Sequence, residues 1–350
     1  HRFRDDKEGG HGSVDMYKSI VESCDTYYYT LARDMGVDLM HDQMKPLGFG
    51  QITGIDILGE SRGVLPSTEW KRTTYKKPEQ QRWYSGETIS LGIGQGYNNF
   101  TMLQIAHAMG TVANNGLKMK PHLVREVVDV ETKASTMVAK EPIAQLPLTP
   151  ENLEVIKKGM IGVNIEGTSA TSFVGAQYVS AGKTGTAQVF TVKQNEKYNA
   201  SAIDERMRDH ALFVAFAPAD DPKVALAMVV ENAGFGAQNA APIARRVFDF
   251  VIMGQYPSQE DIEAVQKGQA TRPIGKPRAV ASVPWPPKAA ELAVEEPVVA
   301  ASAAEKAASA AAAKAASAAS TPSAPASAAA KPASATRATG AASAPKSAGR

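Results

Sequence analysis

The residues of this chain best suited to chemistry lie together between 178 and 190. Lys183, Thr184, Gly185 and Thr186 stand at the centre of that stretch. Apolar and polar residues alternate through much of it, which predicts a strand with one buried face. Because glycine has no side chain, a ligand backbone can lie against the strand edge while the lysine and both threonine hydroxyls reach a carboxylate. The stretch therefore predicts a strand that binds a ligand carrying a carboxylate.

Two other interpretations of this stretch have to be weighed. Gly182, Lys183 and Thr184 could end a phosphate-binding loop, but that loop requires glycine at position 177, where the sequence has Gln177. A plain strand with an exposed lysine explains many three-residue matches of this kind. Lys-Thr-Gly is also a signature of serine acyl-transferases that react with β-lactams. The remainder of the chain must decide between the plain strand and the acyl-transferase.

A second pair of polar residues, Ser23 and Asp25, lies near the beginning of the chain. Apolar residues at helical spacing predict two buried helices between 14 and 36, separated by a break at Glu22-Ser-Cys-Asp25. Asp25 is expected to cap the second helix, and Gly36 to end it. The break presents both polar side chains on a short connection. Capping alone would also explain a serine and an aspartate at such a place.

Two glycine-containing motifs farther along fail on their context. The pattern at 59–63 matches a nucleophile elbow around Ser61, but no helix can open at the Val-Leu-Pro that follows it. The pattern at 92–96 lacks the third glycine of a dinucleotide fingerprint, because Tyr97 stands in its place. Glycine and proline punctuate the segment 47–95, so we expect it to be rich in loops.

The rest of the folded part is predicted as helices and antiparallel strands. Apolar residues at helical spacing predict helices over the ranges 101–115, 150–161 and 240–253. Two apolar runs, 211–217 and 224–230, predict a well-covered hairpin. The polar segment 194–209 is predicted as an exposed loop.

Composition sets the limits of the fold and of its partners. With 350 residues, 43% of them hydrophobic, and a net charge of +2, the chain can bury a sizeable core and has no bulk attraction to nucleic acid. A single cysteine excludes an internal disulfide, and no apolar run is long enough to span a bilayer. Beyond residue 300 the chain is mostly Ala, Ser, Pro and Lys, which cannot bury enough surface to offset ordering. We expect one folded domain over 1–256 and a mostly disordered low-complexity tail over 257–350.

The two polar motifs, in this order and followed by a hairpin and a helix, resemble those of the penicillin-binding transpeptidases. The resemblance is closest to the elongation-specific class B enzymes, the penicillin-binding protein 2 group. It covers about residues 1–256. The stretches that carry it are Gly10-His-Gly12, Ser23-Cys-Asp-Thr-Tyr-Tyr28, Thr53-Gly-Ile-Asp-Ile57, Gly92-Ile-Gly-Gln-Gly96, Gly182-Lys-Thr-Gly-Thr-Ala-Gln-Val-Phe190 and Arg208-Asp-His210.

The resemblance implies an α+β fold, the penicillin-binding/β-lactamase-like transpeptidase fold, with an antiparallel sheet between helices on both faces. The family's nucleophile is the serine of a Ser-x-x-Lys motif that precedes the Ser23 motif. Ser180 and Lys183 have that spacing, but on a strand their side chains would point to opposite faces, and Ser343 with Lys346 lies in the tail. We therefore expect the nucleophile and the N-terminal part of the domain to lie upstream of His1, in a longer protein.

The resemblance also implies an activity, peptidoglycan D,D-transpeptidation in cell-wall elongation and cell-shape maintenance. Such an enzyme forms an acyl-serine ester from the D-Ala-D-Ala end of a stem peptide, and β-lactams compete. Ser23 and Lys183 would be catalytic, whereas Asp25, Thr184, Gly185 and Thr186 would bind substrate. With water as acceptor the enzyme would be a D,D-carboxypeptidase. The alternative is a non-catalytic module that binds D-Ala-D-Ala or a partner protein.

Partners and location follow from the same resemblance. We expect the full protein to act at the periplasmic face of the bacterial inner membrane, held by an N-terminal anchor. Its partners would be peptidoglycan stem peptides and other elongation proteins, including a glycosyltransferase. In the family's strand order the strand 224–230 would here be left as an open apolar edge, so the chain alone is expected to be poorly stable and not to be acylated.

The only cysteine, Cys24, lies between Ser23 and Asp25. If the connection is extended, the thiol points away from the cleft, where Asp5 and His11 could fold back onto it. Cys, His and Asp are ordinary zinc ligands, and some members of the penicillin-binding protein 2 group carry zinc here, with one further Asp. A lone buried cysteine is also commonly an inert small hydrophobe. The sequence thus predicts a structural zinc site with an incomplete ligand set.

Overall fold

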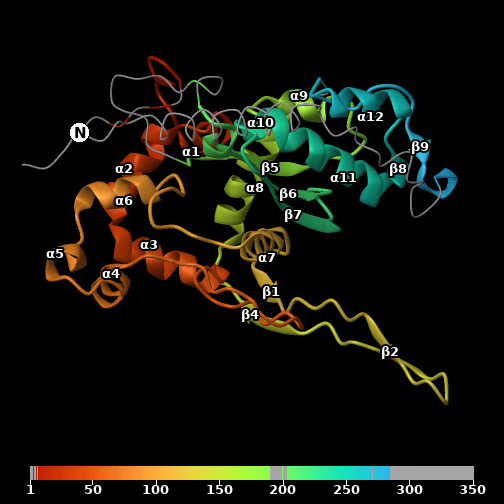
Figure 1. The fold of residues 1–350 in the computed structure, drawn as a ribbon, viewed down its shortest axis with the longest axis horizontal. Helices are drawn as coiled ribbons and strands as arrows, with labels where there is room; N and C mark the ends of the chain where they lie inside the picture. Colours follow the sequence, from red (N-terminus) through yellow and green to blue (C-terminus); the bar gives the residue numbers. More distant parts are fainter. Residues whose placement is uncertain are drawn as a thin grey trace, which may run out of the picture. The chain divides into compact units, whose positions relative to one another are not determined.

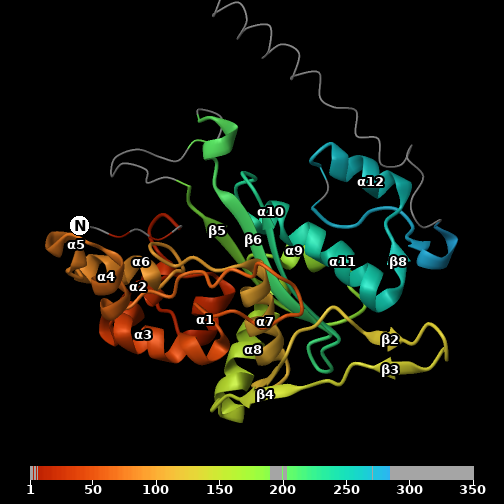
Figure 2. The same ribbon diagram turned by 60° about the horizontal axis from the view of Figure 1, so that its bottom comes forward.

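The computed structural model describes residues 3, 5, 7–189, 199, 203–269 and 271–283. Its centre is a three-stranded antiparallel sheet in the order β5 (Ala181–Ala187), β6 (His210–Ala217) and β7 (Val224–Val230). The register places Lys183 opposite Val214, and Val214 opposite Ala227. Figure 2 shows the sheet with helices on its two sides.

Alternate residues of β6 enter two different cores, as the twofold period of a strand requires. Phe213 packs on one face with Phe248 of α11 (Ala241–Met253). Phe216 packs on the other face with Val163 of α8 (Pro150–Ile165), beside Ile20 of α1 (Met16–Val21). The predicted fold class, an antiparallel sheet between helices, is therefore confirmed.

The helices that precede β1 begin with the predicted pair between 14 and 36. The predicted pair at the beginning is present, and Gly36 ends the second helix with φ 74°. The segment 47–95 is rich in loops, as predicted, and three short helices that were not predicted form within it. The elements are α1 (Met16–Val21), α2 (Asp25–Met35), α3 (Val37–Met44), η1 (Lys45–Leu47), α4 (Thr68–Thr74), α5 (Pro78–Gln81), α6 (Ser85–Leu91) and α7 (Met102–Ala113).

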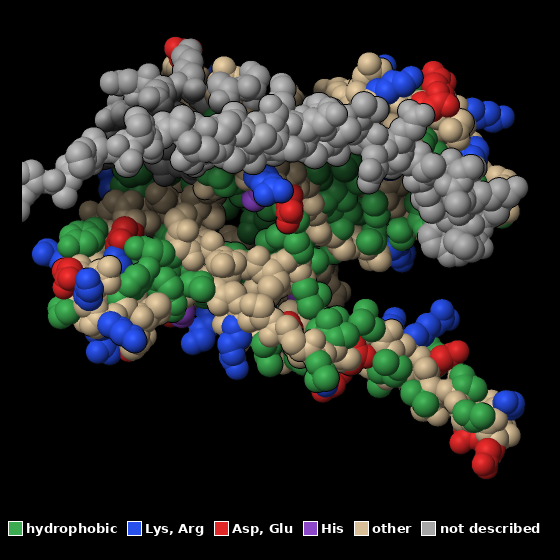
Figure 3. Space-filling model, viewed as in Figure 1, with side chains coloured by type: hydrophobic (Ala, Val, Ile, Leu, Met, Phe, Trp, Pro, Cys, Tyr) green, Lys and Arg blue, Asp and Glu red, His purple; other side chains and the backbone are tan. Residues whose placement is uncertain are grey.

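Two small two-stranded sheets between α7 and α8 were not predicted. β1 (Leu117–Met119) pairs with β4 (Pro142–Gln145), and β2 (Glu126–Val128) pairs with β3 (Ser135–Met137). The β2–β3 hairpin projects from the rest of the chain in Figure 1. Hydrophobic side chains lie on its surface between charged ones in Figure 3, and Val130 at its tip is 81% exposed.

The predicted strand 178–190 is shorter in the structure, because only Ala181–Ala187 pairs with β6. Phe190 and much of the predicted loop 194–209 lie outside the described residues. Within that loop, η3 (Glu205–Met207) forms, and Asp209 at its end is buried, not exposed as predicted. The short helices α9 (Ala170–Phe173) and α10 (Gly236–Asn239) flank the sheet.

Folded structure continues past residue 256, where the predicted tail begins. α12 (Gln259–Gln266) follows, and β8 (Gln255–Tyr256) pairs with β9 (Arg278–Ala279), before η4 (Val280–Ser282). Asp261 of α12 is fully buried and pairs with Arg246 of α11 through two short bonds of 2.8 and 2.6 Å. The predicted boundary at 256 is therefore too early for these elements, whereas the tail from 284 onward lies outside the described residues.

The last strand of the sheet, β7, has one strand neighbour in the described part of the chain, β6. All seven of its residues are only half-buried, although none of them is polar. The expected open apolar edge is thus confirmed, while the low stability inferred from it stays a prediction. Among the described residues, no helix is both long enough and apolar enough to cross a membrane.

Candidate active site

Ser23 lies in the tight connection between α1 and α2. Its backbone is left-handed, with φ 59°, which is uncommon for a residue other than glycine. Backbone bonds from Ser23 to Ile20 and from Cys24 to Ser19 close the turn. Asp25 was predicted to cap α2, but Cys24 takes the cap position and Asp25 is the first residue of the helix. Its negative charge there is favoured by the partial positive charge of the helix N-terminus.

Lys183 brings the two polar motifs together. Its Nζ donates to Ser23 Oγ over 2.7 Å and to the carbonyl oxygen of Thr184 over 2.9 Å. Both side chains are only partly exposed, so the ammonium lies beside the serine hydroxyl where water screens it less than at the surface. The pairing of residues that are 160 positions apart is the geometry expected of a shared site.

Thr184 and Thr186 have different neighbours from Lys183. The Thr184 hydroxyl lies 2.7 Å from the Thr168 hydroxyl, and the Thr186 carbonyl oxygen accepts from Gln95 Nε2 at 2.9 Å. Because Gln95 reaches the Thr186 carbonyl oxygen from outside the sheet, the backbone groups of Thr186 point away from β6. Thr184 lies two residues earlier on the strand, so its backbone groups point the same way. Thr168 and Gln95 were not predicted as site residues, and only their positions in the fold reveal them.

A buried polar network supports β5 from beneath. Asn164 Nδ2 donates to Ser180 Oγ over 2.8 Å, and Ser169 donates to Asn164 Oδ1 over 2.6 Å. A side chain at Gly182 would collide with Phe213 and Asn164, at 2.5 and 3.0 Å. This glycine is therefore required for close packing, and the strand that carries Lys183 is fixed by α8.

Two serines considered from the sequence do not have the surroundings of a nucleophile. Ser180 is 4% exposed, and its hydroxyl accepts a hydrogen bond from Asn164 Nδ2. Ser61 lies in an extended loop with no strand directly before it and no helix directly after it. The doubt about the elbow motif is thus confirmed.

Asp5, His11 and Cys24 come together behind the Ser23 turn, as predicted. Their ligand atoms lie within 4.8 Å of one another. His11 Nδ1 is 3.0 Å from Asp5 Oδ1, and the Cys24 thiol donates to Asp5 Oδ2 over 3.4 Å. Burial raises the pKa of the thiol, and the bond to Asp5 raises it further. One nitrogen, one oxygen and one sulfur donor at this spacing fit zinc.

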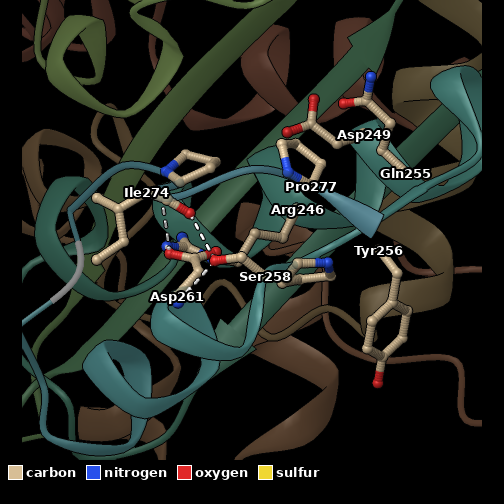
Figure 4. A pocket seen from close by; sticks show the side chains of 10 residues that line it. Arg246, Asp249, Gln255, Tyr256, Ser258, Asp261, Ile274 and Pro277 are labelled. Atoms are coloured by element: carbon tan, nitrogen blue, oxygen red, sulfur yellow. Dashed lines mark hydrogen bonds and ion pairs between the residues drawn. The ribbon is translucent and has the colours of Figure 1, made fainter. Parts of the chain in front are cut away.

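The small pocket shown in Figure 4 belongs to another part of the fold. Its volume is about 20 Å³, which suits a single water molecule. It lies among α11, β8 and α12, where Arg246 and Ser258 bond to Asp261. None of the polar residues around Ser23 and Lys183 lines it.

Comparison with known proteins points to one family. Residues 2–249 match the model of the penicillin binding protein transpeptidase domain. The peptidoglycan D,D-transpeptidase MrdA of Haemophilus influenzae is 43% identical over 261 residues, which are 74% of this chain and 39% of that protein. The MrdA of Escherichia coli K12 is 40% identical over 255 residues, covering 72% of this chain and 39% of that protein.

Solved structures agree. A PBP2 of Pseudomonas aeruginosa in complex with WCK 5153 is 37% identical, with a TM-score of 0.58, over 71% of this chain and 50% of that one. The PBP2 of Helicobacter pylori in complex with MreC is 29% identical, with a TM-score of 0.59, over 73% of this chain and 43% of that one. The chain thus spans about two-fifths of the curated relatives' length.

Proposed function

This chain belongs to the penicillin-binding protein transpeptidase family, and on that premise we propose that it supplies two of the three catalytic motifs of a peptidoglycan D,D-transpeptidase. The observation that carries the proposal is the 2.7 Å contact between Lys183 Nζ and Ser23 Oγ. A lysine beside a serine hydroxyl in a half-buried site favours proton transfer through that hydroxyl, as acyl transfer to and from a serine requires. Names of relatives, peptidoglycan D,D-transpeptidases, support the substrate class.

The roles of the residues follow from elementary acyl-transfer chemistry. A serine of a Ser-x-x-Lys segment attacks the carbonyl carbon of the penultimate D-Ala, and the terminal D-Ala leaves as its amine. Ser23 relays a proton to that amine, and Lys183 stabilises the negative charge that develops nearby. The acyl group then passes to the amine of a second stem peptide, which restores the free serine. Within these 350 residues, the two Ser-x-x-Lys sequences lie at Ser180 and Ser343, and Ser180 is buried against Asn164.

Substrate is held along β5. The edge of β5 away from β6 has no strand neighbour in the described part of the chain, so an extended peptide can pair there. Gly185 leaves room for the peptide backbone, and the hydroxyls of Thr184 and Thr186 bind its terminal carboxylate. Asp25, two residues from Ser23, holds an amide of the peptide. β-Lactams that imitate the D-Ala-D-Ala end compete for the same edge.

Zinc has a structural part in this proposal. The ion would be held by Asp5, His11 and Cys24. It would cross-link the segments that carry these residues and so stabilise the Ser23 turn. His11 Nε2 also lies 3.9 Å from Glu22 Oε2, so a carboxylate faces the ring nitrogen that a ligand bond through Nδ1 leaves available. A structural site commonly has four ligands, so three residues alone bind zinc more weakly than a complete set.

Location and partners are proposed on the same grounds. A cell-wall transpeptidase works outside the cytoplasm, which supports the periplasmic face of the inner membrane. One related PBP2 is in complex with MreC, and another structure describes a peptidoglycan synthase complex that coordinates polymerisation with crosslinking. These complexes support elongation proteins, among them a glycosyltransferase, as partners.

The test joins residues 1–350 to the part of the Haemophilus influenzae relative that precedes its matching region, where the family resemblance implies a Ser-x-x-Lys segment. We expect fluorescent penicillin to label this hybrid in a manner that survives denaturation, and to leave the 350-residue chain unlabelled. The control replaces the serine of the supplied segment by alanine. A folded hybrid that competes reversibly for penicillin without labelling would instead identify a non-catalytic binding module.

A further inference from the structure

The loop after α6 touches both halves of the proposed site. Gly92 packs so closely on α2 that a side chain there would lie 2.6 Å from the Tyr28 carbonyl oxygen. Three residues later, Gln95 Nε2 donates to the Thr186 carbonyl oxygen on β5 over 2.9 Å. The helix carries Asp25, and the strand carries Lys183. The loop therefore spans the distance between the two motifs.

The loop that carries Gln95 is also fixed to α6, the helix that precedes it. Backbone bonds from Gly94 to Leu91 and from Gln95 to Ser90 close the turn that follows α6. Tyr97 donates to Glu87 Oε1 over 2.9 Å. The same carboxylate oxygen accepts a bond from Lys71.

Lys71 makes that anchor rigid. It is 3% exposed, and its Nζ lies 5.4 to 5.5 Å from the ring centres of Trp83, Tyr84 and Tyr97. A buried ammonium with an aromatic cage and a carboxylate has few alternative positions. The loop is thus attached to a fixed point at one end and to the catalytic strand at the other.

We propose that Gln95 is a positioning residue, which sets the place of the Lys183 strand relative to the Ser23 turn. This inference rests on the proposed function. Alternation presents the carbonyl oxygens of Gly182, Thr184 and Thr186 at the open edge of β5. Lys183 bonds that of Thr184, and Gln95 bonds that of Thr186. Gln95 therefore holds β5 at the position where its edge meets the ligand, with no contact to the reacting atoms.

The experiment measures hydrogen exchange in the 350-residue chain, for the peptide covering 182–189. Gln95→Ala should raise its exchange rate about threefold to tenfold, the loss expected for one side chain–backbone hydrogen bond. The matched control is Gln81→Ala, which removes a bond of the same kind, from Gln81 Nε2 to the Tyr75 carbonyl oxygen, and should leave this peptide unchanged.

A second variant separates hydrogen bonding from general packing. Gln95→Glu has the same size, but its ionised carboxylate cannot donate to a carbonyl oxygen. At pH 7 the exchange rate of peptide 182–189 should be higher in Gln95→Glu than in Gln95→Ala. Below about pH 4 the carboxyl group is protonated and can donate, so the ratio of the Gln95→Glu rate to the wild-type rate should fall towards one. Equal exchange of peptide 182–189 in the wild-type chain and both variants at pH 7 would overturn the proposal. This outcome holds whether or not the variants unfold at the same temperature as the wild-type chain.

The catalytic arm uses the hybrid described above. Gln95→Ala should lower the second-order rate constant of penicillin acylation about tenfold, which corresponds to the loss of one hydrogen bond that positions the strand. If no hybrid is labelled at all, the proposed function fails, whereas the exchange results still decide whether Gln95 holds β5. Normal acylation by Gln95→Ala together with raised exchange would overturn the positioning role.

Discussion

Lys183 Nζ donates to Ser23 Oγ over 2.7 Å, and this single bond joins a strand to a turn that precedes it by 160 residues. In the hybrid, Lys183→Ala should lower the rate of penicillin acylation about tenfold to a hundredfold, the range for a hydrogen bond to a charged group. The fold should be little affected, because both side chains are partly exposed. The matched control is Lys223→Ala, at a side chain that is 61% exposed. Equal acylation by Lys183→Ala and Lys223→Ala would exclude the proposed role.

Zinc is expected in the hybrid at one equivalent per chain, and in the 350-residue chain with lower affinity. Cys24→Ser should abolish stoichiometric zinc in both, because the thiolate is the strongest of the three donors. Metal analysis by mass spectrometry after dialysis provides the measurement. His41→Ala removes a histidine outside the cluster and should change nothing. Zinc that persists in Cys24→Ser, or is absent from the unaltered hybrid, rules the site out.

The segment beyond 256 should contribute to stability. A chain cut after Tyr256 loses Asp261 and leaves Arg246 without its buried partner, at a cost of about 3 to 5 kcal/mol in the free energy of unfolding. A chain ending at residue 283 retains the pair. Asp261→Asn in that longer chain should destabilise it similarly, whereas the exposed neighbour Glu260→Gln should not. Urea unfolding that gives the same free energy for the two lengths would contradict this expectation.

Glu87 predicts a pH dependence of stability. Burial alone would raise its pKa, but the bonds from Lys71, from the Tyr84 backbone and from Tyr97 outweigh burial and hold the pKa below the usual 4.5. A lowered pKa in the folded state stabilises the fold above pH 4.5, and this contribution is lost as the pH falls through the folded-state value.

Glu87→Gln should therefore lower the free energy of unfolding by about 2 to 3 kcal/mol near neutral pH. The difference from the wild-type chain should stay constant down to about pH 5 and shrink below pH 4.5. Urea unfolding over a pH series measures it, with Glu79→Gln, at an exposed position of α5, as the control. A difference that is the same at pH 3 and pH 7 would show that Glu87 acts without its charge.

The sequence was most informative where a local pattern decides the structure. Alternation identified β5 around Lys183, and the helix predicted over 150–161 begins where α8 does, at Pro150. We predicted that a zinc ion would join Asp5, His11 and Cys24 because of their residue types and the family resemblance, and not because of their spacing. Their ligand atoms do lie close together. Ser23 and Asp25 were placed in the correct turn, although Cys24 is the cap.

What the sequence did not reveal depends on contacts between distant segments. Gln95 belongs to the stretch 92–96 that carries part of the family resemblance, but nothing in the sequence places its side chain beside Thr186. Asp261 lies in a charged stretch that resembles a solvated tail, and only the guanidinium of Arg246 makes its burial possible. Short helices such as α4 and α5 are too brief for periodicity to distinguish them from loops.

Ser23 combines a hydroxyl with a left-handed backbone, φ 59°. Glycine would adopt that conformation with less strain, by about 1 kcal/mol, so the position favours one residue for folding and another for proton transfer. A family member that lost its chemistry would be free to drift to glycine here and would become more stable as it did so. A glycine at this position would therefore mark a relative that kept the fold without the proposed proton relay.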